Sequence, residues 1–90
     1  MLVVFSTTTN SKRYGRNNHN RYFKDWANAQ KEMDKQVETL VKDGARIVRS
    51  LDRMNVDKGF YEYQKDLQFK EENGEVYEMS LSVYDAYFED

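Results

Sequence analysis

Cationic and aromatic side chains are concentrated between residues 12 and 21. The side chains there that suit phosphate contact or base stacking are Lys12, Arg13, Tyr14, Arg16, His19 and Arg21. Guanidinium and ammonium groups meet phosphates, and aromatic rings stack on bases. This pattern indicates a segment that binds nucleic acid or phosphate. A solvated polar loop and a contact with an acidic partner protein are the two alternative interpretations.

His19 is the only histidine and therefore the only ordinary acid–base group that titrates near neutral pH. A small ribonuclease would pair it with a second acid or base and a cation for the phosphate. Tyr14, Arg13 and Arg16 are close in sequence, but no spacing fixes their geometry. We therefore expect no catalytic residue and no enzymatic activity.

Carboxylates flank a predicted hairpin turn at Glu71, Glu72, Glu75 and Glu78. Their spacing does not match a calcium loop, which must converge several oxygens on one point. The chain has no cysteine, and it contains no glycine-rich phosphate loop. We expect neither a bound metal nor a cofactor.

A second group of aromatic residues belongs to the C-terminal half. Phe60, Tyr84, Tyr87 and Phe88 would form an aromatic patch, rimmed by acidic residues at 85, 89 and 90. Aromatic centres with polar rims are typical of protein interfaces. The pattern favours a protein-binding surface or self-association, and the alternative is a tail that folds back to complete the core.

These residues have to be positioned by a small set of elements. Apolar and polar periodicity predicts strands at 2–8, 45–54, 60–70 and 75–84, a polar loop at 9–20, and a helix at 21–43. The expected fold is α+β, with the order β-α-β-β-β. Four strands would form a mainly antiparallel sheet with the long helix packed on one face.

The helix is predicted from one apolar stripe and two end signals. The stripe comprises Tyr22, Trp26, Ala29, Met33, Val37, Leu40 and Val41. Asn20 is expected to cap the N-terminus, and Gly44 stands where a left-handed C-terminal residue is favoured.

Parity sets the register of the last two strands. Their apolar residues are odd-numbered, so a three-residue Glu72–Gly74 turn keeps them on one face, pairing Phe69 with Tyr77 and Leu67 with Met79. Tyr84 would then lie on the other face. The less regular alternation of 45–54 predicts a bulge or an edge strand.

Length and composition bound the remaining possibilities. Ninety residues make a single domain, 1–90, in which we expect a flexible basic loop at about 9–20 and an acidic, aromatic C-terminal tail at about 85–90. The longest apolar run, Leu2–Phe5, is too short to cross a membrane. Residues 1–24 hold five basic residues and no acidic one, although the whole chain has a net charge of −2.

The sequence thus predicts a cytoplasmic, non-enzymatic protein-binding module. The first alternative is a nucleic-acid-binding protein that uses residues 12–21. The second is a small phage or mobile-element protein that acts on host machinery.

Overall fold

The computed structural model describes the backbone of residues 2–11, 15–55 and 60–86, and the side chains of 2–11, 15–53 and 63–85. Within these residues the chain forms five strands and one helix. In chain order they are β1 (Leu2–Ser11), β2 (Gly15–Phe23), α1 (Trp26–Lys42), β3 (Arg46–Asn55), β4 (Phe60–Lys70) and β5 (Val76–Ala86).

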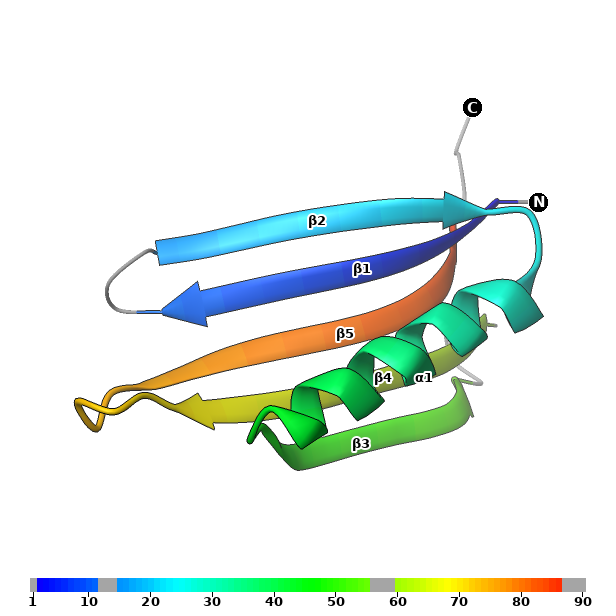
Figure 1. Cartoon of the computed structure of the whole chain (residues 1–90). Helices are drawn as coiled ribbons and strands as arrows, with labels where there is room; N and C mark the ends of the chain where they lie inside the picture. The colour runs from blue at the N-terminus through cyan, green and yellow to red at the C-terminus, as the bar shows by residue number, and fades with distance from the viewer. Residues whose placement is uncertain (1, 12–14, 56–59, 87–90) are drawn as a thin grey trace.

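All five strands belong to one antiparallel sheet in the order β2-β1-β5-β4-β3. The helix runs diagonally across one face, from the end of β2 towards the start of β3 (Figure 1). The α+β class and the single packed helix are confirmed. The number of strands was predicted wrongly, because the sheet has five strands and not four.

The additional strand is β2, which occupies most of the segment predicted as a loop. It pairs with β1 without interruption, from Val3 opposite Phe23 to Ser11 opposite Gly15. Eight of its nine residues are exposed, so β2 carries no apolar alternation that periodicity could detect. Backbone pairing and polar contacts hold it instead: the Asn18 side-chain amide donates to the Thr8 hydroxyl at 2.8 Å.

The helix begins five residues later than predicted. Its N-cap is Asp25, whose carboxylate accepts the Asn28 backbone N–H at 2.8 Å, and the predicted cap Asn20 lies within β2. Tyr22 is also in β2 and not in the helix stripe. The rest of the stripe is confirmed at its centre, where Ala29, Met33 and Val37 are buried.

The predicted turn chemistry is confirmed at two glycines. Gly44 follows the helix with φ 107°, and Gly74 has φ 86° in the β4–β5 turn. In that turn the backbone N–H of Gly74 donates to the carbonyl of Glu71 at 2.9 Å. The register pairs Phe69 with Tyr77 and Leu67 with Met79, as predicted. β3 is both an edge strand and irregular, with a register shift between residues 47 and 49.

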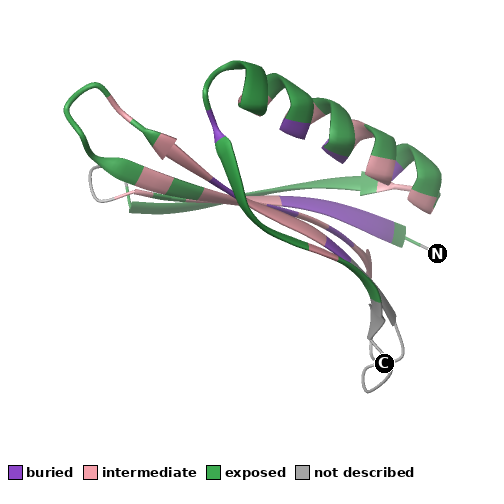
Figure 2. Cartoon of the chain, turned by 90° about the horizontal axis from the view of Figure 1, so that it is seen from below, coloured by how far each residue is buried: buried purple, intermediate pink, exposed green. Residues whose placement is uncertain are grey.

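The helix covers one face of the sheet and leaves the other face without a helix (Figure 2). Odd-numbered residues of β1, β4 and β5 pack under α1, and the core comprises Val3, Phe5, Ala29, Met33, Val37, Ala45, Tyr63, Leu67, Leu81 and Val83. Even-numbered residues of the same strands point to the opposite side. We call that side the open face. It also carries the even-numbered residues of β2. From β3 it carries the residues that are paired with even-numbered β4 residues, namely Arg46, Arg49, Leu51 and Arg53.

Candidate functional site

One end of the open face carries two tyrosines on either side of a valine. Val4 of β1 is paired with Tyr22 of β2 and with Tyr84 of β5. Val4 is only 3% exposed although it faces away from α1, whereas Tyr22 is 62% exposed and Tyr84 half-buried. The arrangement buries the apolar centre and leaves one aromatic ring available to a binding partner.

The middle of the open face is a hydrogen-bonded field of small polar side chains. The Asn18 amide donates to the hydroxyls of Ser6, at 3.1 Å, and of Thr8. On the other side of the field, Asp66 Oδ1 accepts from Ser80 Oγ at 2.6 Å and from Gln64 Nε2 at 2.9 Å. Because each side chain is held by a neighbour, the field is ordered before any partner arrives.

Most of the described cations of the open face lie on the two outer strands, whereas its described acids lie on inner strands. Arg16 lies on the β2 edge, and Arg49 on the β3 edge is paired with Asp66. Of the described open-face side chains, the cations Arg16, Arg46, Arg49, Arg53 and Lys70 outnumber the acids Asp66 and Glu78. This face is therefore locally basic in a chain that is acidic overall.

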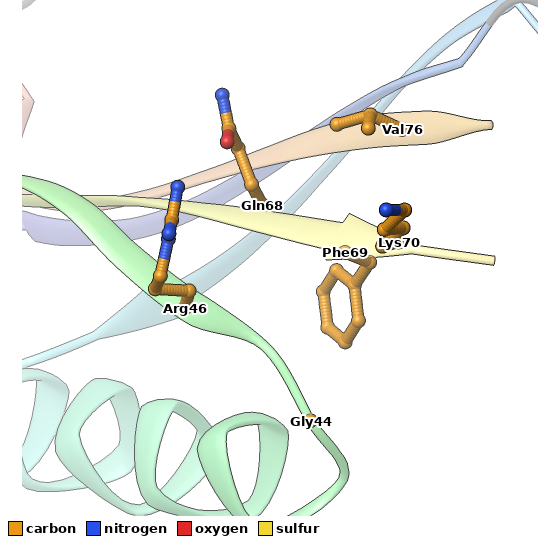
Figure 3. A pocket seen from close by; sticks show the side chains of 6 residues that line it. All are labelled: Gly44, Arg46, Gln68, Phe69, Lys70 and Val76. Carbon is orange, nitrogen blue, oxygen red and sulfur yellow. The ribbon is translucent and has the colours of Figure 1, made fainter. Parts of the chain in front are cut away.

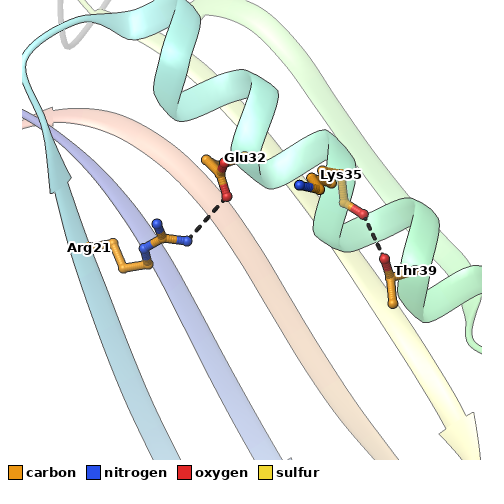
Figure 4. Close-up of polar contacts among 4 residues, drawn as sticks. All are labelled: Arg21, Glu32, Lys35 and Thr39. Atoms are coloured by element: carbon orange, nitrogen blue, oxygen red, sulfur yellow. Dashed lines mark hydrogen bonds and ion pairs between the residues drawn. The ribbon is translucent and has the colours of Figure 1, made fainter.

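The predicted basic cluster is divided by the strand that contains it. Arg16 lies on the open face, whereas His19 and Arg21 point to the helix side, because neighbouring strand residues alternate. Arg21 forms an ion pair with Glu32 of α1 at 3.3 Å (Figure 4) and covers the Phe23 ring. Lys12, Arg13 and Tyr14 lie outside the described residues. The described members therefore do not share one face.

The predicted aromatic patch is described in part. Tyr84 lies on the open face, as its parity indicated. Phe60 belongs to β4, but its side chain is outside the description, as are Tyr87 and Phe88. The tail half of this patch stays a prediction.

Sequence reasoning placed Tyr22 both among the aromatic residues of the basic segment and in the helix stripe, and it did not predict the position of Tyr22 on the open face of a sheet. A hairpin signal was present. Gly15, with φ 75°, separates two polar segments of similar length, Thr7–Ser11 and Arg16–Asn20. Pairing these segments with Ser11 opposite Gly15, which is the register that the structure has, places Tyr22 opposite Val4.

Three hollows mark the surface near these groups. One of about 180 Å³ lies on the open face, lined by Thr8, Asn10, Arg16, Glu78 and Ser80. A larger one of about 370 Å³ lies beyond the helix end (Figure 3). There Phe69 points away from Arg46 and Gln68, and its ring stacks on Tyr77 at 4.8 Å. The third, of about 290 Å³, involves the β2 edge at Gly15.

Within the described part of the chain, no group of three or more potential metal ligands converges. His19 is exposed and lies opposite Thr7, so the described structure gives it no acid–base partner. In the same residues, no helix is both long and apolar enough to cross a membrane.

Comparisons with protein-family models, with curated proteins and with solved structures found no match.

Proposed function

We propose that this chain is a non-enzymatic binding module that docks a partner protein on its open face. The observation that carries the proposal is the exposed Tyr22 beside the buried Val4, at the margin of an ordered polar field. Tyrosine supplies large contact area at a small cost in conformational entropy, since few of its bonds rotate. Tyrosine and arginine are also the residues that most often dominate binding energy.

The composition of the field supports the same proposal. Binding surfaces of antibodies combine tyrosine with serine and asparagine, which supply adaptable hydrogen bonds. The open face carries the same types, including Asn18, Ser80 and Ser82 beside Tyr84. Because the strands hold these groups rigidly, binding would order few side chains.

Arginines at both edges indicate the chemistry of the partner. Arg16 and Arg49 would lie at the rim of a contact centred on β1 and β5. Rim charges steer association and select partners of opposite charge. The proposed partner therefore presents an acidic surface with an apolar pocket for Tyr22.

The test is quantitative capture of binding proteins by the immobilised chain. A Tyr22→Ser, Arg49→Glu double variant should lose the partner that the wild type retains. Val41→Ser is the matched control, because Val41 is 43% exposed on the helix and not on the open face. A partner held equally by a folded double variant would contradict the proposal.

Single-stranded nucleic acid is a second candidate ligand. The observation in its favour is the excess of cations among the described side chains of the open face, which also carries Tyr22 and Tyr84. We expect an Arg16→Ala, Arg49→Ala variant to bind short labelled RNA more weakly and with less dependence on salt. Fluorescence anisotropy at low and physiological salt measures both. If the wild type does not bind at low salt, the second candidate is wrong.

A further inference from the structure

Within the described residues the sheet has two outer strands, β2 and β3. They differ in how well they are protected against pairing with a strand of another molecule. An edge strand presents unpaired backbone groups that a further strand can use. β3 has a register irregularity and three arginines, Arg46, Arg49 and Arg53, which are features that protect an edge. β2 has an unbroken register, and its two arginines, Arg16 and Arg21, lie on either side of an uncharged centre of three asparagines and His19. Of the two edges, β2 is the one suited to pairing.

We infer that β2 pairs with β2 of a second copy, antiparallel and around a twofold axis at His19. Residues that face each other in such a pair must point to the same side of the sheet and expose their backbone groups to the same edge. Pairing His19 with His19 of the second copy satisfies both conditions along the whole strand. A shift of two residues in either direction would leave two positions unpaired at the ends.

In this register each arginine of β2 faces an uncharged residue of the second copy. Arg16 lies opposite Tyr22 of the second copy, which places a guanidinium beside an aromatic ring on the open face. Arg21 lies opposite Asn17, and Asn18 lies opposite Asn20. No arginine faces another arginine, and Arg21 is already paired with Glu32 of its own helix, which limits the repulsion between the two strands.

The position of the helix favours the same contact. On the helix side, α1 begins beside the end of β2 and crosses towards β3, leaving the corner at the start of β2 uncovered (Figure 1). This corner is the hollow of about 290 Å³, lined by Thr9, Ser11, Gly15, Asn17, Glu71 and Tyr77. In the pair, Phe23 of the second copy lies opposite Gly15, which has no side chain to obstruct the ring. Because the two β2 strands are antiparallel, the two helices lie at opposite ends of the shared edge and do not collide.

The contact would join the two open faces into one continuous surface. It is nevertheless tested separately from partner docking, because His19 points to the helix side. A variant at His19 therefore leaves the open face unchanged.

Disulfide trapping tests the register directly, since the chain has no cysteine of its own. In His19→Cys the two sulfurs would belong to directly opposed residues, whose Cα atoms are about 4.5–5.5 Å apart and within disulfide range. Asn17→Cys is the matched control on the same strand and face. Its two copies would be separated by four residues along the pair, or about 13 Å.

Under mild oxidation we expect His19→Cys to form covalent dimer at least about tenfold faster than Asn17→Cys, as seen on non-reducing gels. Equal rates, or no dimer from either variant, would overturn the inference. Circular dichroism of both reduced variants should match the wild type, because both positions are exposed.

Sedimentation equilibrium provides a measurement without covalent trapping. His19→Lys places two like charges opposite each other and should raise the dimer dissociation constant roughly fivefold or more. Val48→Lys adds the same charge on the β3 edge, at an exposed residue where the β3–β4 register shifts, and should leave that constant unchanged. A wild type that stays monomeric up to millimolar concentration would overturn the inference.

Discussion

Tyr63 of β4 donates a hydrogen bond from its phenol to the Asp34 carboxylate of α1. The bond joins two elements that are 29 residues apart in the chain and fixes the helix against the sheet. Tyr63 is 6% exposed. Burial, together with the bond to Asp34 and its negative charge, raises the pKa of Tyr63 to about 12.

This pKa predicts a loss of stability in alkali. The unfolded tyrosine ionises near its ordinary pKa of 10.0, whereas the folded one keeps its proton to about 12. A raised pKa in the folded state stabilises the fold below pH 10, and that contribution falls as the pH rises from 10 to 12. Since one pKa unit corresponds to about 1.4 kcal/mol, the loss should reach roughly 2–3 kcal/mol.

Tyr63→Phe is the variant that isolates this effect. Urea unfolding between pH 9 and 12 should show a weaker pH dependence for Tyr63→Phe than for the wild type. Tyr77→Phe serves as the control. If both variants lose stability with pH as steeply as the wild type, Tyr63 is not the group responsible.

The core under the helix predicts a large effect at Met33. Its side chain is fully buried among the apolar residues of α1 and the sheet. Met33→Ala removes those contacts and leaves a cavity, which should cost about 2–5 kcal/mol of unfolding free energy. Val41→Ala, on the exposed side of the same helix, should change stability by less than about 1 kcal/mol. Chemical unfolding of both variants makes the comparison, and similar losses would contradict this packing.

Most of the fold was predictable where burial imposes a pattern. The odd-numbered residues of β4 and β5 had to share a face, which fixed the hairpin register at Phe69 and Tyr77. The helix stripe had the same origin, because Met33 and Val37 must face the core together. Both predictions depended on side chains that leave water.

The predicted start of the helix was wrong because the sequence offers two possible N-cap residues. Asn20 and Asp25 are both good caps, and Tyr22 fits the helical spacing as well as it fits a strand. The choice depends on β1, which takes residues 15–23 into the sheet through backbone hydrogen bonds. Apolar periodicity does not reveal such pairing when the strand's side chains are exposed.

The two caps can be distinguished by substitution. Asp25→Ala removes the acceptor for the backbone and side-chain amides of Asn28 and should cost about 1 kcal/mol of unfolding free energy. Asn20→Ala should cost much less, since Asn20 is an exposed β2 residue. Urea unfolding compares the two. A larger loss for Asn20→Ala would favour a helix that begins at residue 21.

Of the candidate site, the sequence predicted only which β5 residues face away from the helix. Tyr84 follows from the alternation of β5, but its neighbour Tyr22 depends on the β1–β2 pairing. Separation of Arg16 from His19 and Arg21 has the same cause, because a strand divides a cluster that a loop would keep together. The basic segment 12–21, which suggested a binding site most strongly, was therefore also the segment whose structure was hardest to predict from the sequence.

Hydrogen exchange of β2 amides tests this strand in solution. Alternate amides between residues 15 and 23 point towards β1 and should exchange slowly, while those that point outwards should exchange fast in dilute protein. Asn18→Ala removes the side-chain bonds to Ser6 and Thr8 and should speed exchange at the slow positions without affecting β4. Raising the protein concentration should slow the outward amides if two copies pair through this edge. Uniformly fast exchange throughout residues 15–23 at every concentration would mean that the segment is a loop, and that neither the edge nor the position of Tyr22 is as described.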